Sequence, residues 1–152
     1  MTRARKVSGR KRHLVVDTAG NVLAVAVDTA AMSDVEGAAW VLARARARWP
    51  ELAYGWADQA YRGAVDWAAR TYGITLEIVE RPAEARGFVL LPRRWVVERS
   101  LAWTGRARRL AKEYEHHADH TELLVYLAAC WRLLQCLAPS ATRERPYLRK
   151  AG

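Results

Sequence analysis

The strongest indication of the fold is the segment Leu52-Ala53-Tyr54-Gly55-Trp56-Ala57-Asp58, an apolar run that ends in a carboxylate. The run has the length and composition of a buried strand, which puts Asp58 at the strand's carboxyl end. A second acid, Glu98, lies in the basic segment at residues 92–99, which has the pattern of a helix. Two carboxylates held in this way can share a hard divalent cation beside a polyanion. The pair therefore indicates phosphodiester chemistry on a nucleic acid.

Short strands and amphipathic helices alternate on both sides of this stretch. Upstream, two β-branched runs at residues 13–17 and 22–27 flank a Gly/Asn turn, which predicts a β-hairpin. Ser33 and Glu36 have the spacing of a capping box, which predicts a helix from there to Pro50. The other predicted elements are a helix at 64–72 closed by Gly73, a strand at 76–79, and helices at 94–112 and 121–137. This order predicts a mixed α/β sheet with helices packed against it.

The composition favours a single folded domain with an anionic partner. The chain has 152 residues, 25 Lys and Arg against 16 Asp and Glu, and a net charge of +9. Such an excess favours nucleic acid as the partner, although an arginine-rich proteome would give the same balance. The hydrophobic share of 51% argues against disorder. No apolar run approaches the roughly 20 residues of a membrane span, and no signal core follows Met1, so we expect a cytoplasmic protein without a membrane anchor.

The domain boundaries follow the charge pattern. We expect a basic flexible leader at residues 1–12, one folded domain at 13–138 and a disordered basic tail at 139–152. Cys130 and Cys136 are six residues apart on a predicted helix and are expected to be reduced thiols in the core.

Several aromatic side chains have a structural and a functional interpretation. His116, His117 and His120 lie in a polar connector without cysteines at zinc-finger spacing, so a solvated turn is favoured over a metal site. Most tryptophans fall at apolar helical positions and are expected in the core: Trp40, Trp49, Trp67 and Trp131. Trp103 lies among arginines and is the candidate for stacking on DNA.

Three segments carry a family resemblance: Gly-Arg-Lys-Arg-His-Leu-Val-Val-Asp-Thr at residues 9–18, Trp-Ala-Asp-Gln-Ala-Tyr-Arg-Gly at 56–63, and Arg-Trp-Val-Val-Glu-Arg at 94–99. In this order they resemble successive blocks of bacterial insertion-sequence transposases of the DDE type, in the branch whose reading frame is often split. The resemblance extends from Gly9 to about Leu137. It implies a ribonuclease-H-like mixed sheet with flanking helices, in which three acids bind two Mg²⁺ ions and drive DNA cleavage and strand transfer.

The resemblance also implies roles for individual residues. Asp58 looks like the second acid of the triad and Glu98 like the third, and both would be metal ligands. The structural alternatives are an aspartate that caps the following turn and a surface glutamate that pairs with Arg94. The family's arginine one helical turn before the glutamate is matched by Arg94, whereas its tyrosine and lysine positions fall on Leu91 and Gly105, so that signature is half kept. The arginines expected to face DNA are Arg94, Arg99, Arg106 and Arg109.

The first acid of the family has no counterpart in this pattern. In the family it lies on a strand upstream of the block at residues 9–18, and the chain reaches Met1 a few residues before that block. We therefore expect the first strand and its aspartate to be missing. Asp17 lies at a sheet edge and Asp28 ends a strand before a loop, where turn-forming aspartates are common, so neither is expected to replace it.

Three functions remain open at this point. The first is part of a DDE transposase, inactive alone, which acts on transposon ends and target DNA as a homo-oligomer or together with an upstream-frame fragment. The second is a non-catalytic DNA-binding fragment that regulates a full-length transposase. The third is an unrelated ribonuclease-H-like nuclease with its own complete site. A third carboxylate close to Asp58 and Glu98 would favour the last of these.

Overall fold

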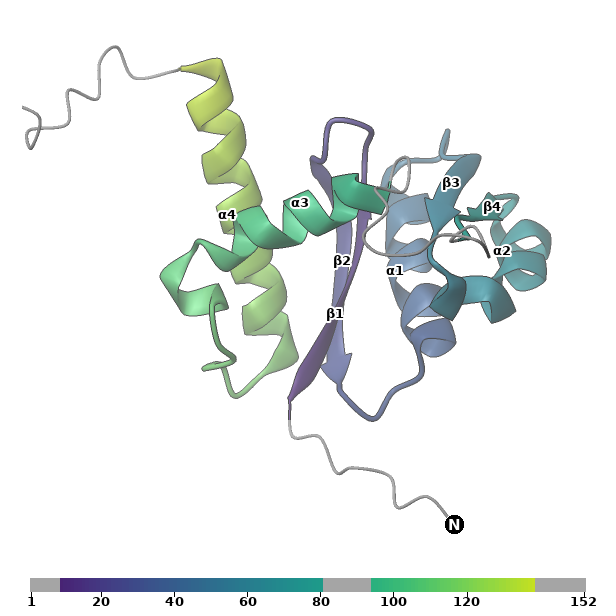
Figure 1. The fold of residues 1–152 in the computed structure, drawn as a ribbon, viewed down its shortest axis with the longest axis horizontal. Helices are drawn as coiled ribbons and strands as arrows, with labels where there is room; N and C mark the ends of the chain where they lie inside the picture. Colours follow the sequence, from purple (N-terminus) through teal and green to yellow (C-terminus); the bar gives the residue numbers. More distant parts are fainter. Residues whose placement is uncertain (1–8, 81–93, 139–152) are drawn as a thin grey trace, which may run out of the picture.

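The computed structural model describes residues 9–80 and 94–138, which form a mixed α/β fold (Figure 1). Its elements are, in order, β1 (Arg10–Val16), β2 (Val22–Thr29), α1 (Asp34–Arg48), β3 (Tyr54–Ala57), the 3₁₀ turn η1 (Gln59–Ala64), α2 (Val65–Tyr72), β4 (Thr75–Ile78), α3 (Arg94–Gly105), the 3₁₀ turn η2 (Arg108–Leu110) and α4 (Ala118–Leu137). The predicted order of a hairpin, helix, strand, helix, strand and two helices is confirmed.

The strands form two separate pairs. β1 and β2 are antiparallel, with Arg10 opposite Thr29, whereas β3 and β4 are parallel. The single mixed sheet expected from the sequence is therefore not formed by the described residues, because no strand joins the two pairs. β1 begins at Arg10, so residues 10–12 belong to a strand and not to a leader. Residues 1–8 and the predicted tail at 139–152 lie outside the described residues.

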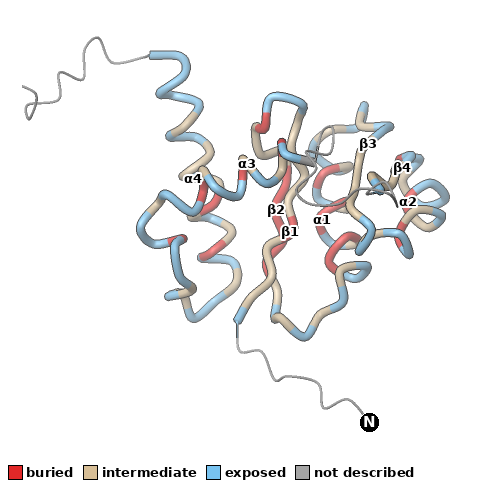
Figure 2. The backbone as a smooth tube through the Cα atoms, viewed as in Figure 1, coloured by how far each residue is buried: buried red, intermediate tan, exposed pale blue. Residues whose placement is uncertain are grey.

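The β1–β2 hairpin packs between α1 and α4, and the alternation of side chains along β2 assigns its two faces. Ala24 and Ala26 join the cluster formed with α1, and Val25 and Val27 join the cluster formed with Val125 of α4. Figure 2 shows this pattern as buried positions on β2 and on the helices beside it. Small residues face α1 and larger residues face α4, as expected for a strand covered on both sides.

Local sequence signals set the ends of α1 and α2. The Ser33 hydroxyl accepts the Glu36 amide hydrogen at 3.2 Å, and the Glu36 carboxylate accepts the Ser33 amide hydrogen at 3.0 Å. This is the predicted capping box, in which each residue satisfies an unpaired donor of the other. Gly73 ends α2 with a left-handed φ of 65°, a conformation that favours glycine. Both predictions are confirmed.

The edge of β2 that faces away from β1 is closed by side chains. The Val25 amide donates to the Tyr126 hydroxyl at 3.3 Å, and the Val27 amide donates to Glu122 Oε1 at 2.9 Å. Arg44 Nη1 donates to the Val25 carbonyl at 2.8 Å and to Glu122 Oε1 at 2.6 Å. Residues from α1 and α4 thus satisfy main-chain groups that another strand would otherwise use.

Some expectations about the C-terminal helices are wrong. The helix predicted at residues 94–112 ends at Gly105 and is followed by a short 3₁₀ turn. Trp40 is 50% exposed and Trp131 is 64% exposed, whereas Trp49 and Trp67 are half-buried. Both cysteines are free and exposed and are therefore not core thiols. The spacing that predicted burial identifies an apolar face, but it does not say which face of an apolar helix meets the core.

Candidate metal site and nucleic-acid interface

Asp58 lies at the junction between β3 and η1. It directly follows the last residue of β3 and is the N-cap of η1, where its Oδ1 accepts the Ala60 amide hydrogen at 2.9 Å. The side chain is half-buried. Asp58 therefore caps the turn, as its structural alternative predicted, and it also stands at the carboxyl end of a parallel strand. Ligands bind beyond this end of strands in open α/β sheets.

Glu98 is an exposed residue of α3. Arg94 begins the same helix, but its side chain lies outside the described part of the structure. Among the residues that the structure describes, no group of three or more His, Cys, Asp and Glu side chains is arranged to hold a metal ion. The three histidines are exposed, but only His116 and His117 lie in the predicted connector, since His120 belongs to the first turn of α4.

A close contact with the β1–β2 turn positions α3. The Ser100 hydroxyl, which is buried, donates to the Gly20 carbonyl at 2.9 Å. Gly20 has a φ of 85°, and a Cβ added there would lie 2.9 Å from Ser100 Oγ. Only glycine combines this backbone conformation with such a close helix. The turn predicted from Gly20 and Asn21 therefore also serves as the docking point of α3.

Arginine and tryptophan side chains form a stack on α3 and α4. The Arg99 guanidinium carbon lies 4.2 Å from the Trp95 ring centre and 4.5 Å from that of Trp103, and Arg132 of α4 lies 3.6 Å from the Trp103 ring. Arg99 Nη2 also donates to the Ala19 carbonyl at 3.0 Å. Each contact is a cation–π or hydrogen-bonding interaction within the protein. Two side chains predicted to touch DNA, Arg99 and Trp103, are thus engaged in joining α3 to its neighbours.

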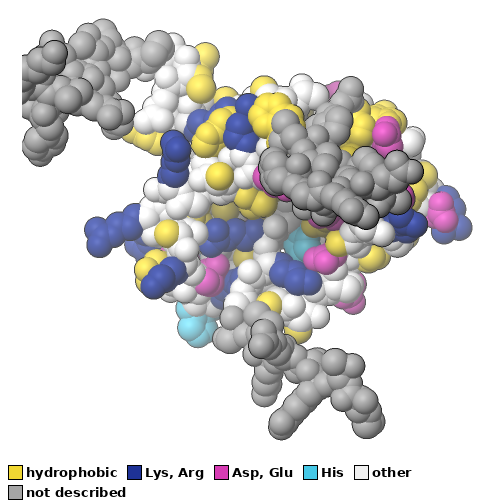
Figure 3. Space-filling model, in the orientation of Figure 1, with side chains coloured by type: hydrophobic (Ala, Val, Ile, Leu, Met, Phe, Trp, Pro, Cys, Tyr) yellow, Lys and Arg dark blue, Asp and Glu magenta, His cyan; other side chains and the backbone are white. Residues whose placement is uncertain are grey.

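The connector between α3 and α4 carries exposed cations. Arg106, Arg108 and Lys112 are exposed there, and Arg109 is exposed but lies 2.7 Å from Glu115. Basic side chains project over this connector on the left of Figure 3. Within the described residues, Arg106, Arg108 and Lys112 take part in no ion pair. They are therefore the cations of this segment best placed to meet phosphate.

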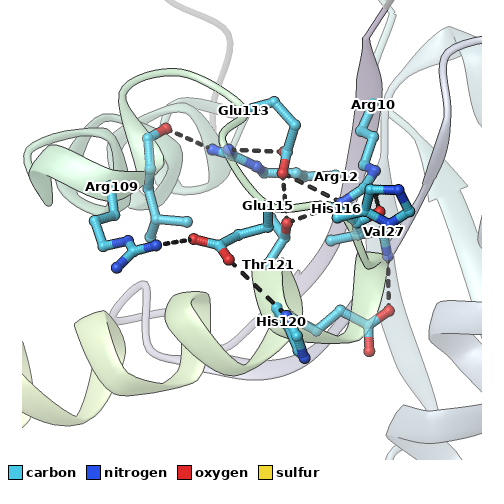
Figure 4. Close-up of polar contacts among 11 residues, drawn as sticks. Arg10, Arg12, Val27, Arg109, Glu113, Glu115, His116, His120 and Thr121 are labelled. Atoms are coloured by element: carbon cyan, nitrogen blue, oxygen red, sulfur yellow. Dashed lines mark hydrogen bonds and ion pairs between the residues drawn. The ribbon is translucent and has the colours of Figure 1, made fainter.

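A second set of basic residues is neutralised inside the molecule (Figure 4). Arg10 Nη1 lies 3.3 Å from Glu113 Oε1, and Arg12 Nη2 lies 3.4 Å from Glu113 Oε2. The Thr121 hydroxyl of α4 donates to the same carboxylate at 2.6 Å. Glu113 thus joins β1 to the start of α4. The charge pattern predicted a flexible leader that includes both arginines, and it gives no sign of this contact because Glu113 is distant in sequence.

A buried polar pair lies beside Asp58 and was also missed. His13 Nδ1 and the Tyr61 hydroxyl are 2.8 Å apart, which links β1 to η1. Burial lowers the pKa of His13, since desolvation penalises the imidazolium, and it raises the pKa of Tyr61 to about 12. The His13 ring packs against Gly37 of α1, where an added Cβ would lie 2.1 Å from Nε2. No local sequence signal connects these three residues.

No helix in the described residues is long and apolar enough to cross a membrane.

Comparison with known proteins assigns the chain to a family. Neither a curated protein nor a solved structure shows a significant match to the chain. A family model described as "Transposase DDE domain" matches residues 1–133, which is most of the chain. The chain therefore belongs to the transposase DDE domain family.

Proposed function

We propose that the chain is part of a DDE transposase with a ribonuclease-H-like fold, and that Asp58 and Glu98 are two of its metal ligands. The family match over residues 1–133 carries this proposal. The position of Asp58, at the carboxyl end of a strand and half-buried, supports it. DNA transposition requires cleavage and joining of phosphodiesters, for which the basic connector supplies a surface that attracts the substrate.

The donor chemistry of the two acids fits Mg²⁺. Carboxylate oxygens are the protein ligands that this hard cation prefers, and the cap of η1 uses only one oxygen of Asp58. When bound, metal ions in such sites activate water and then a 3′-hydroxyl for in-line attack on DNA. Asp58 and Glu98 would hold the cation.

A third acid would come from outside the described residues. Asp17 is unsuited, because its carboxylate accepts hydrogen bonds from the amides of Ala19 and Asn21 and from the Asn21 side chain, each at 2.8 Å. We expect two carboxylates without a third to bind the metal weakly and not to support transposase or endonuclease activity.

Titration with Mn²⁺, which reports on carboxylate sites by electron paramagnetic resonance, tests the metal role. We expect weak binding to the 152-residue chain that Mg²⁺ competes for, and a loss of at least about tenfold in affinity in Asp58→Asn and in Glu98→Gln. Asp66→Asn is the matched control, because Asp66 is an exposed acid of α2. Equal affinity in the Asp58 and Asp66 variants would refute the assignment.

A non-catalytic DNA-binding fragment is the second candidate, and it is favoured by the exposed cations at Arg106 and Arg108. Fluorescence anisotropy on a DNA duplex would measure the dependence of affinity on salt. Loss of both charges in Arg106→Gln/Arg108→Gln should reduce the slope of log affinity against log salt by about 1–2. Arg48→Gln/Arg70→Gln removes two exposed arginines elsewhere and is the control. DNA binding with no specific metal site would select this candidate over the first.

We further propose that an upstream-frame fragment of the transposase pairs with β1. The outer edge of β2 is closed, and its Val25 and Val27 amides point away from β1. Their partners in the ladder, Leu14 and Arg12, must then direct their own amides and carbonyls away from β2. Among the described residues, nothing beyond that ladder accepts or donates a hydrogen bond to these main-chain groups. β1 is therefore the side on which a strand can be added.

Hydrogen exchange followed by NMR would test this pairing. In the 152-residue chain the Arg12 and Leu14 amides should exchange much faster than those of Val25 and Val27. Co-expression with the polypeptide translated from the DNA upstream should slow the exchange of Arg12 and Leu14. If those two amides are protected without a partner, or are unaffected by it, the proposal fails.

A further inference from the structure

α4 has an apolar face on the side that points away from the protein. Thr121 and Val125 are buried on its inner side, where they pack against the hairpin. On the other side Leu123, Leu127 and Leu134 are each exposed by 56–57%, Trp131 by 64% and Leu137 by 81%. Figure 2 shows the exposed positions continuing to the end of the helix.

The exposed residues follow the spacing of a helix–helix interface. We call the set of Leu123, Leu127, Cys130, Leu134 and Leu137 the α4 seam. Its members are separated by four, three, four and three residues, which is the a/d pattern of a coiled-coil heptad. Arg132 is the charged residue within this span, and it points inward to Trp103 and to Asn21 Oδ1 at 2.8 Å. The seam therefore has a helical period and no charge.

We propose that the α4 seam binds the α4 seam of a second copy of this chain and so forms a two-fold dimer. A period of 3.5 residues selects another helix as the occupant. Because the seam is uncharged, it is compatible with itself, as a two-fold interface requires. The exposed surface of α1, by contrast, includes the charged residues Glu36 and Arg48, which would oppose an apolar partner.

The size of the surface is also compatible with a protein partner. Apolar surface on the order of 500 Å² per copy, near the upper limit for a monomer, comes from five large side chains that are each more than half exposed: Leu123, Leu127, Trp131, Leu134 and Leu137. A specific interface buries about 800 Å² per partner. The α4 seam and Trp131 thus supply most of what such an interface needs.

Analytical ultracentrifugation of the full chain tests the dimer. We expect a dimer at micromolar concentration and at least about a 100-fold weaker association in Leu127→Gln/Leu134→Gln, since each substitution acts in both copies. Trp40→Gln is the control, because Trp40 is an exposed apolar residue on α1. A wild-type chain that stays monomeric, or a dimer that the double variant leaves intact, would overturn the proposal.

The two cysteines supply a second test that leaves the leucines in place. Cys130 belongs to the seam, whereas Cys136 lies off it, and both are exposed and free. A short bismaleimide cross-linker should join two copies of Cys136→Ser through Cys130, and should join two copies of Cys130→Ser poorly. Equal or reversed cross-linking would overturn the geometry. Because Asp58 and Glu98 lie outside α4, Mn²⁺ binding by the Leu127→Gln/Leu134→Gln variant separates failure of the dimer from failure of the proposed metal site.

Discussion

At the scale of single residues, Gly37 makes room for the ring of His13, which packs against α1 at this position. A glycine within a helix costs up to about 1 kcal/mol relative to alanine, yet alanine at position 37, in the first turn of α1, would place its Cβ 2.1 Å from His13 Nε2. We expect Gly37→Ala to lower the free energy of unfolding by about 1–3 kcal/mol, the usual cost of overpacking, as measured by urea denaturation.

Two variants show whether the His13 ring is the cause. Gly105→Ala adds the same methyl group where nothing lies within 4 Å, and it should be neutral or slightly stabilising. Adding His13→Ala to Gly37→Ala removes the obstructing ring, so the two substitutions should show a favourable coupling energy. If Gly37→Ala is as stable as the wild type, the packing described here is incorrect.

The same histidine makes stability depend on pH. Burial lowers the pKa of His13 below its ordinary 6.5, so the unfolded chain binds a proton at a pH where the folded chain does not. The free energy of unfolding should therefore be at its full value above pH 6.5 and should fall as the pH drops below it. Urea denaturation between pH 7 and 5.5 measures this fall. It should be smaller in His13→Gln, which removes the buried imidazole.

At the scale of elements, Glu122 closes the outer edge of β2. Its carboxylate accepts the buried Val27 amide at 2.9 Å and pairs with Arg44. Glu122→Ala leaves that amide without a partner, and we expect a loss of about 1–3 kcal/mol in the free energy of unfolding. Glu51→Ala removes an exposed acid and should change stability little. A Glu122 variant as stable as the Glu51 variant would show that water replaces the contact.

The sequence predicts some features of the elements and not others. Features set by neighbouring residues were predicted, whereas features set by residues far apart in the chain were not. The start of α1 and the end of α2 were predicted because Ser33, Glu36 and Gly73 act on neighbours within one turn. The splitting of the sheet, the His13–Tyr61 pair and the contacts of Glu113 depend on residues far apart in the chain. The leucines of α4 identified a helix, but its apolar residues surround it and could not indicate the buried face.

At the scale of the whole molecule, β2 is shared by two hydrophobic clusters. Its alanines belong to the cluster with α1, and its valines belong to the cluster with α4. The α4 side cannot unpack without disturbing the strand against which α1 packs. We therefore expect one cooperative unfolding transition for the described elements, and not a separate transition for each cluster.

Val25→Ala tests this cooperativity, because Val25 is fully buried on the α4 side of β2. Loss of two methyl groups should lower the free energy of unfolding by about 1–3 kcal/mol. Circular dichroism reports on all helices, and the fluorescence of Trp49 and Trp67 reports on the α1 side, so both signals should shift to the same lower urea midpoint. Val35→Ala, in which the valine is 37% exposed, should shift neither by much. The fluorescence is measured in a variant whose only tryptophans are Trp49 and Trp67. If Val25→Ala shifts the urea midpoint seen by circular dichroism but not the midpoint seen by fluorescence, the two clusters unfold independently.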